Sequence, residues 1–236
     1  MGIIRTALLT SLYGVTGGVA SVGAGMAYLA ASTTLVDLTK SDPMFKTKTY
    51  ARYNPKDNPA LQDVVIKRVP LSKIRPELRD SEEALTLEFC RGVWSRWGFW
   101  PQSKFHARYD HPPGLTDTLW STSDLAVATY PPGLKFSNHF EVVGNEGAEI
   151  VVRCGGSPLE PGLRNSDGLV FISARVDRES EVAEFRLKSA LFNSAAEGKG
   201  KGKGEGEKHP IPPKIEFLHT WYVRMLVQSA VGNVKA

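Results

Sequence analysis

The sequence predicts an α+β domain in which a curved antiparallel sheet packs against one long C-terminal helix, preceded by a single transmembrane helix. Three observations support this prediction. Residues 6–36 contain no charged side chain. The second half of the chain holds two pairs of β-rich runs, each pair joined by a short polar turn. An apolar pattern with helical spacing then follows all of the predicted strands.

The composition is that of one ordinary globular domain. The chain has 236 residues, of which 42% are hydrophobic and 23% charged, and its net charge is +4. Basic residues are scattered along the chain, so no nucleic-acid groove is indicated. Two cysteines, Cys90 and Cys154, cannot build a disulfide framework or a zinc site, and we expect two buried thiols. The chain lacks nucleotide-binding, hydrolase-elbow and HExxH motifs, so we expect neither a cofactor nor a metal.

Residues 1–36 are predicted to be the membrane segment. A helix of about 20 residues crosses a bilayer core, and the uncharged stretch is longer than that. Three alternatives remain open: a secretory signal peptide cleaved near Ala30-Ala31-Ser32; a mitochondrial presequence, which would need more arginine than Arg5 alone; and N-myristoylation, whose loose pattern Met1-Gly2 with Thr6 fits. The basic residues after the segment place the domain on the cytosolic side by the positive-inside rule. Small-residue pairs at Gly14/Gly18 and Ser21/Gly25 are compatible with self-association.

Residues 37–62 are predicted to be a linker, because three Asp-Pro or Asn-Pro turn signals interrupt them. The domain itself is assigned to residues 63–236. It begins with a β-rich run at 64–69, which Pro70 ends. A helix then follows over residues 80–97, with Asp80 and Glu83 at capping-box spacing. Its apolar stripe consists of Leu85, Phe89, Val93 and Trp97.

The remaining elements are predicted from alternation and turns. Residues 124–130 are assigned to a short strand. Runs 136–143 and 149–154 form one hairpin, and runs 169–176 and 182–192 form a second. A Gly/Lys/Glu loop at 195–208 is expected to be mobile. The final helix presents an apolar face made of Ile215, Leu218, Tyr222, Met225, Leu226 and Ser229.

This order of elements resembles the helix-grip fold of the START-like superfamily, which has an early strand, helices, an antiparallel meander and a long last helix. The resemblance implies a cavity between the helix and the sheet. The hot-dog fold of thioesterases and dehydratases is the alternative, in which the helix at 80–97 would lie at the centre of the sheet. A helix that follows all the strands favours the helix-grip fold.

A second resemblance rests on Phe140-Glu141-Val142-Val143, Arg153-Cys154-Gly155-Gly156-Ser157-Pro158 and Ser166-Asp167-Gly168-Leu169. These segments look like a set of uncharacterised proteins of filamentous fungi, some of which accompany secondary-metabolite genes. The similarity runs from about Asp42 to the C-terminus. It assigns no role to any residue.

The candidate catalytic residues are His139, Glu141 and Asp167. His139 and Glu141 are two residues apart, so on a strand they would share one face and could exchange protons near neutral pH. Asp167 stands near Arg153 in the predicted sheet. The two could form a structural ion pair or a clamp for a ligand carboxylate or enolate.

The candidate ligand-binding residues are aromatic or cationic. An aromatic cluster at the end of the first helix can be core or can line a pocket. His106 and His219 are further candidates, and His219 would face the sheet from the last helix. The ligand-binding set is Trp94, Trp97, Arg153, Phe171, His219 and Tyr222.

These features together indicate a membrane-anchored binding domain for a lipophilic small molecule. The domain could also isomerise, cyclise or dehydrate that molecule in fungal secondary metabolism. Two alternatives remain open: a hot-dog thioesterase-like enzyme and a non-catalytic accessory protein of a membrane. An enclosed central helix would support the first alternative, and an exposed apolar patch with a shallow pocket would support the second.

Overall fold

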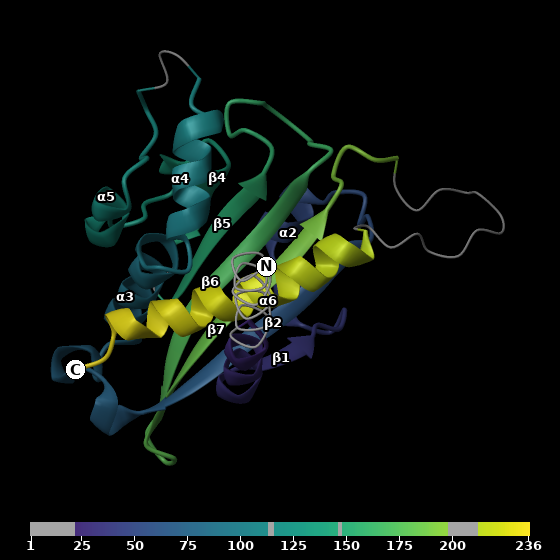
Figure 1. Ribbon diagram of the computed structural model, residues 1–236. Coiled ribbons are helices and arrows are strands. Elements are labelled where there is room, and N and C mark those ends of the chain that lie inside the picture. The colour runs from purple at the N-terminus through teal and green to yellow at the C-terminus, as the bar shows by residue number, and fades with distance from the viewer. Residues whose placement is uncertain (1–21, 113–115, 146–147, 198–211) are drawn as a thin grey trace, which may run out of the picture.

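The computed structural model describes residues 22–112, 116–145, 148–197 and 212–236. Within these residues, seven antiparallel strands form one curved sheet in the order β1-β2-β7-β6-β5-β4-β3 (Figure 1). A long helix follows the last strand, which confirms the predicted α+β class with a C-terminal helix. The strands are β1 (Thr34–Asp37), β2 (Ala60–Pro70), β3 (Lys135–Phe136), β4 (Phe140–Asn145), β5 (Glu149–Gly155), β6 (Asp167–Asp177) and β7 (Val182–Phe192).

The first long strand pairs with the last one. Register pairs run from Ala60↔Phe192 to Pro70↔Val182, so β2 is hydrogen-bonded along its whole length to β7. The two predicted hairpins are present as β4–β5 and β6–β7. Strand β6 is buried on both sides over its first eight residues, which places it at the centre of the sheet.

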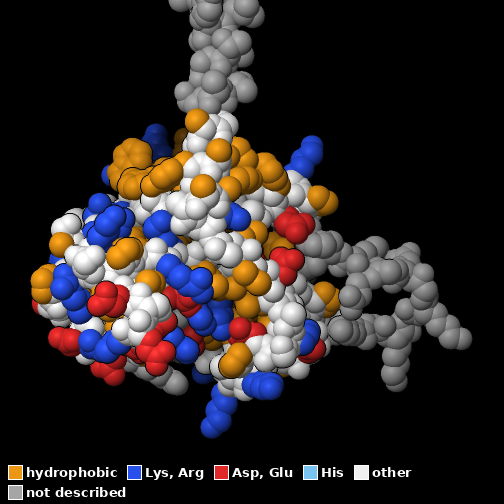
Figure 2. Space-filling view, turned by 90° about the horizontal axis from the view of Figure 1, so that it is seen from below, with side chains coloured by type: hydrophobic (Ala, Val, Ile, Leu, Met, Phe, Trp, Pro, Cys, Tyr) orange, Lys and Arg blue, Asp and Glu red, His pale blue; other side chains and the backbone are white. Residues whose placement is uncertain are grey.

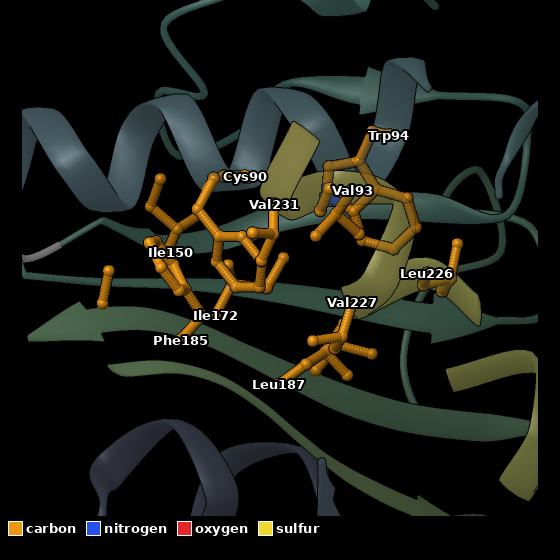
Figure 3. Packing of buried hydrophobic residues seen from close by; sticks show 14 of the residues in the cluster. Cys90, Val93, Trp94, Ile150, Ile172, Phe185, Leu187, Leu226, Val227 and Val231 are labelled. Carbon is orange, nitrogen blue, oxygen red and sulfur yellow. The ribbon is translucent and has the colours of Figure 1, made fainter. Parts of the chain in front are cut away.

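One side of the sheet, the helix face, is covered by α3 (Glu82–Ser95) and α6 (Pro213–Ala230), with α4 (Trp100–Tyr109) and α5 (Thr122–Val127) beside them. Side chains from α3, α6 and the strands interlock there (Figure 3). Gly92 of α3 lies against the backbone of Ala230, where a Cβ atom would have no room. Helix α3, which the hot-dog alternative would place at the centre of the sheet, instead shares the helix face with α6.

The other side, the cover face, is covered by residues 38–58, including η1 (Pro43–Lys46) and α2 (Lys48–Tyr53). Leu38, Met44 and Tyr50 are buried against the sheet there. The structure therefore differs from the predicted linker. The turn signals in this segment serve as caps, since the Asp42 carboxylate accepts the Met44 N–H and the Asn54 side chain binds the backbone of Asn58.

The end of the predicted membrane segment belongs to the sheet. Residues 34–37 form β1 and pair with β2, and residues 22–32 are helical. Arg224 of α6 donates to the carbonyl and the hydroxyl of Thr33, which attaches this helical stretch to α6. Residues 1–21, which include most of the segment, lie outside the described residues. In the part of the chain that is described, no helix is sufficiently long and apolar to cross a bilayer.

Two local predictions need correction, and a third falls mostly on residues that are not described. The expected strand at 124–130 is the helix α5, capped by Ser121, whose hydroxyl accepts the Ser123 N–H. The first helix starts at Glu82, because Ser81 rather than Asp80 is its N-cap. The predicted mobile loop at 195–208 lies outside the described residues from 198 onward. Residues 195–197 are described and follow β7.

The predicted apolar face of the last helix is correct in part. Of its members, Leu226 and Ser229 are buried, and the neighbouring Val223, Val227 and Ala230, which the prediction did not include, are buried with them. In the first half, Ile215 and Leu218 are exposed. The first half of α6 therefore lies beyond the packed core, and space remains beneath the helix near Tyr222.

Candidate functional site

A cavity of about 290 Å³ lies between the sheet and helices α3, α4 and α6. Its volume is at the lower end of the range for small-molecule sites, which is about 300–1,000 Å³. Most of the lining is apolar and comes from α3, β4, β6, β7 and α6. The lining consists of Trp94, Gln102, His106, His139, Phe140, Cys154, Gly155, Ser166, Val170, Leu187, Ser189, Leu191, His219, Tyr222, Val223 and Leu226.

Two histidines and an aspartate meet at one end of this cavity. His106 and Asp110 are four residues apart on α4 and at its C-cap, so they share one side of the helix. The Nδ1–H of His106 donates to Asp110 Oδ2 at 2.6 Å. His139 enters from the turn before β4, and its Nε2 lies 3.4 Å from the same oxygen. The two imidazole rings are 4.2 Å apart.

A second polar group lies where α6 crosses β2 and β7. Asp63 and Ser189 are register partners, and the Ser189 hydroxyl donates to Asp63 Oδ1 at 2.5 Å. His219 Nε2 lies 3.0 Å from the Ser189 oxygen and 3.3 Å from Asp63 Oδ2. Serine here lies between aspartate and histidine, whereas in hydrolytic triads the histidine is central. The group therefore anchors His219 at the cavity, with the Ser189 proton directed at the Asp63 carboxylate.

Tyr222 and Gln102 bridge α6 and α4 across the cavity. The Tyr222 hydroxyl donates to Gln102 Oε1, and the Gln102 amide N–H reaches His106 Nε2 at 3.1 Å. Burial raises the pKa of Tyr222, so its hydroxyl remains a donor. Burial also lowers the pKa of His106, more strongly than the hydrogen bond to Asp110 raises it. The hydrogen bond from His106 lowers the pKa of Asp110. The cavity end therefore holds a neutral His106 beside an ionised carboxylate at neutral pH.

Four residues of the predicted site line the cavity. They come from three different elements: Trp94 from α3, His139 from the turn before β4, and His219 and Tyr222 from successive turns of α6. Trp97 was predicted with them, but its side chain is 54% exposed at the surface beyond α3. The aromatic cluster is mainly core, because Trp94 packs against Phe99, Phe136 and Phe140.

The other predicted site residues lie on the cover face. Phe171 is buried among residues of the cover-face cluster. Arg153 and Asp167 form a buried two-point ion pair at 2.8 and 2.6 Å. Of the two predicted alternatives, this geometry is that of a structural ion pair rather than a ligand clamp. Asp167 does not line the cavity. Glu141 follows the cavity residue Phe140 on β4 and is the register partner of Arg153, so it points to the other face as well.

The predicted sharing of one face by His139 and Glu141 fails for a local reason. Ser137 and Asn138 have positive φ values of 50° and 52°, and β4 starts only at Phe140. Strand alternation does not apply across such a turn, so His139 faces the helices. Its Nδ1–H donates to the Gly155 carbonyl at 2.7 Å.

Sequence reasoning did not identify Asp110, Gln102, Asp63 or Ser189 as site residues, although it named His106. The spacing of His106 and Asp110 was a usable signal, because i and i+4 side chains meet on a helix. The helix α4, which carries His106 and has Asp110 as its C-cap, was not among the predicted elements. Asp63 and Ser189 meet through strand register, which the sequence pattern does not reveal.

A larger open depression of about 950 Å³ lies at the other end of the sheet, near the β6–β7 turn. It is lined mostly by charged residues, and several of them form ion pairs. Arg68 and Arg186 both contact Glu184, and Arg178 contacts Asp80. Such exposed, compensated charges are typical of a solvated surface, so the smaller apolar cavity is the better candidate site.

No protein-family model matches this chain, and no curated protein matches it either. The geometry of the cavity is therefore the basis for any functional conclusion.

Proposed function

We propose that this protein is a membrane-anchored binding domain for a lipophilic small molecule, which lies in the cavity between α6 and the sheet. The cavity itself is the observation that supports this function most directly. Trp94, Phe140 and Val170 supply apolar lining, while His139, His219 and Tyr222 supply polar atoms. Mainly apolar walls with a few polar groups are the usual design of small-molecule sites.

The strand order supports a START-like helix-grip relationship. The first long strand pairs with the last one, and the remaining strands form a meander between β7 and the sheet edge at β3. Helix α6 then crosses the sheet over the cavity. The sequence resemblance to the filamentous-fungal proteins is compatible with this proposal and adds secondary metabolism as its context.

A membrane tether is supported by charge and by surface composition. Residues 6–36 are uncharged. Figure 2 shows hydrophobic side chains gathered around the base of the first described helical residues. On α6, which is attached to that helical stretch, Ile215, Phe217 and Leu218 are at least half exposed. Exposed apolar groups next to an uncharged segment favour contact with lipid.

The binding proposal is tested by a matched pair of valine substitutions. Val170 and Val151 are 8% and 7% exposed and lie on adjacent central strands. Val170 lines the cavity, whereas Val151 belongs to the cover-face cluster. Each Val→Phe change adds similar volume, but Val170→Phe alone fills the cavity.

The measurement is the fluorescence titration of the full-length chain, in detergent, with N-phenyl-1-naphthylamine. We expect saturable binding that Val170→Phe weakens by about tenfold or more, equivalent to about 1.4 kcal/mol. Val151→Phe should leave the affinity unchanged in the folded fraction, which circular dichroism determines. Equal affinities in the two variants, or no saturable binding by the unaltered chain, would refute the proposal.

Proton-transfer catalysis of an isomerase, cyclase or dehydratase type is a second candidate function. It is favoured by the two imidazoles, of His139 and His219, that line the cavity. Histidine is suited to this role because its pKa is near neutrality. If this candidate is correct, His139→Ala should abolish turnover of a bound ligand while retaining its binding.

A further inference from the structure

The end of the cavity at α4 brings together three potential metal-ligand atoms. His106, Asp110 and His139 each offer one atom, and these atoms lie within 4.8 Å of one another. Asp110 Oδ2 lies between the two imidazoles, at 2.6 Å from His106 Nδ1 and 3.4 Å from His139 Nε2. The three residues come from two separate elements, so the fold itself assembles them.

His139 is oriented in the way a metal-binding histidine usually is. Its Nδ1 must carry the proton, because it contacts the Gly155 carbonyl at 2.7 Å and a carbonyl can only accept. Metal-bound histidines commonly donate their second ring N–H to a carbonyl or carboxylate. When Nδ1 carries the only ring proton, the lone pair of Nε2 points toward Asp110.

That lone pair is buried and lacks a hydrogen-bond partner. Across from it, 3.4 Å away, is a carboxylate oxygen, which is also an acceptor. Two acceptors that face each other repel unless a cation or a proton lies between them. The geometry therefore calls for positive charge at this point.

The backbone holds His139 in this position at some cost. Ser137 and Asn138 both adopt left-handed conformations, with φ values of 50° and 52°. The Asn138 amide donates to the Asp110 carbonyl at 3.2 Å, and its side-chain oxygen accepts from Ser157 at 2.7 Å. Consecutive non-glycine residues in this region are strained, and such strain is concentrated at functional sites.

We propose that His106, Asp110 and His139 bind a divalent first-row transition metal ion at the end of the cavity. Two imidazoles and one carboxylate are a ligand set that Fe²⁺ and Zn²⁺ accept, with the remaining positions open. Ligand atoms about 2.1 Å from such an ion are about 3.0–3.4 Å apart. The observed 3.4 Å separation fits this range, and the 2.6 Å separation must open by about half an ångström.

Metal binding requires a neutral histidine with a free lone pair and an ionised aspartate, so the Nδ1–H that His106 now donates to Asp110 must be relocated. When Nδ1 of His106 binds the ion, its proton moves to Nε2. A half-turn of the Gln102 amide then presents Oε1 to that N–H, while the amide nitrogen faces the Tyr222 oxygen.

The open coordination positions would face the cavity, because His106 and His139 both line it. A ligand with a carbonyl, enolate or carboxylate oxygen could then bind the ion directly while its apolar part contacts the cavity wall. The metal site does not depend on the lipophilic ligand, and it is testable with the metal alone. The two proposals can therefore fail independently.

The test uses the full-length chain in detergent, stripped of metal with a chelator and titrated with Co²⁺ and then Zn²⁺. We expect one equivalent of Co²⁺ to bind with visible d–d absorption and to be displaced by Zn²⁺. His139→Ala and Asp110→Asn should each weaken binding by about 100-fold or more, since loss of even an outer-shell partner costs 10–100-fold. The metal should also raise the melting temperature of the unaltered chain.

His111→Ala is the matched control, because His111 neighbours Asp110 but stacks on Trp120 outside the cluster. It should bind Co²⁺ as the unaltered chain does. Asp110→Asn retains size at a half-buried position, and circular dichroism verifies that both ligand variants are folded. Absence of saturable Co²⁺ and Zn²⁺ binding, or equal affinity in His139→Ala and the unaltered chain, would overturn the metal site. In that case the cluster would be a proton-transfer group.

Discussion

Each face of the sheet carries an acid–base cluster, buried on the cover face and partly exposed on the helix face, and the two clusters differ in how completely their polar atoms are paired. On the cover face, Asp167 accepts two bonds from Arg153 and one from Ser194. The Arg153 guanidinium also reaches the Gly162 carbonyl and lies over the Tyr53 ring. On the helix face, His139 retains an unpartnered nitrogen next to a cavity.

This difference separates structural from functional polar groups. A fully paired buried cluster fixes the fold and has no capacity left for a ligand. A cluster with a free lone pair, held by strained backbone at a cavity, can bind a metal ion or transfer a proton. The residue types alone do not distinguish the two, because both consist of carboxylates beside basic side chains.

The largest expected effect is on the cover face. Asp167→Ala leaves the buried Arg153 charge without its partner, and breaking a buried pair in this way costs about 3–5 kcal/mol. The free energy of unfolding from urea titration should fall by that amount. If the loss were below about 1 kcal/mol, the cluster would not be structural and the comparison would fail.

Ser194→Ala should have a smaller effect on the same cluster. The Ser194 hydroxyl donates to Asp167 at 2.6 Å and accepts the Arg164 N–H at 2.8 Å, and the residue is fully buried. Its removal leaves a buried N–H unpaired, which costs about 1–3 kcal/mol. Urea unfolding measures this loss. Co²⁺ binding in the same variant should be unchanged, and a change would indicate that the two faces are coupled.

A pH titration of the metal-free protein tests the lowered pKa of His106 in the helix-face cluster. Burial lowers the pKa of His106 from 6.5, so the unfolded chain takes up its proton more readily. The contribution of His106 to stability is present above about pH 6.5 and is lost as the pH falls toward the lowered value. His106→Asn should therefore flatten the dependence of the melting temperature on pH below 6.5. A slope equal to that of the unaltered chain would contradict the lowered pKa.

The smallest effect is expected at the exposed ion pair of Arg178 and Asp80, whose side chains are 65% and 85% exposed. Exposed pairs contribute about 0–1 kcal/mol. Arg178→Ala should change the free energy of unfolding by less than about 0.5 kcal/mol in urea. A larger loss would mean that exposure is a poor guide to the importance of ion pairs in this chain.

Much of the fold was predictable from local patterns. The alternation along β7 and the turn before it indicated the β6–β7 hairpin, and the apolar spacing after Pro213 indicated α6. The cover-face helices were missed because their sequence signals are caps and turns, which also occur in linkers. Segment 124–130 was misassigned because six residues are too few to establish a helical period.

The site was half predictable. Tyr222 was named because helical spacing places it on the apolar face of the last helix, and it lines the cavity. Trp94 was named as part of an aromatic cluster, whereas Trp97, which helical spacing placed on the apolar stripe, is exposed. Phe171 and Arg153 were placed in the site because β6 and β5 are buried on both faces, so their alternation does not reveal the cavity side. Asp110 approaches His139 through a tertiary contact and through the left-handed turn at 137–138. Neither feature can be recognised from a local sequence pattern.

The pairing of β2 with β7 has a consequence for how the chain folds. Asp63 of β2 can pair with Ser189 of β7 only after nearly the whole domain has left the ribosome. Until then β2 has an unpaired edge, and edges of this kind recruit other chains. Closing so long a loop slows folding, because its entropy is lost before any strand contact compensates for it. A nascent chain with an uncharged N-terminal segment is therefore exposed to aggregation for longer than a domain built from local hairpins.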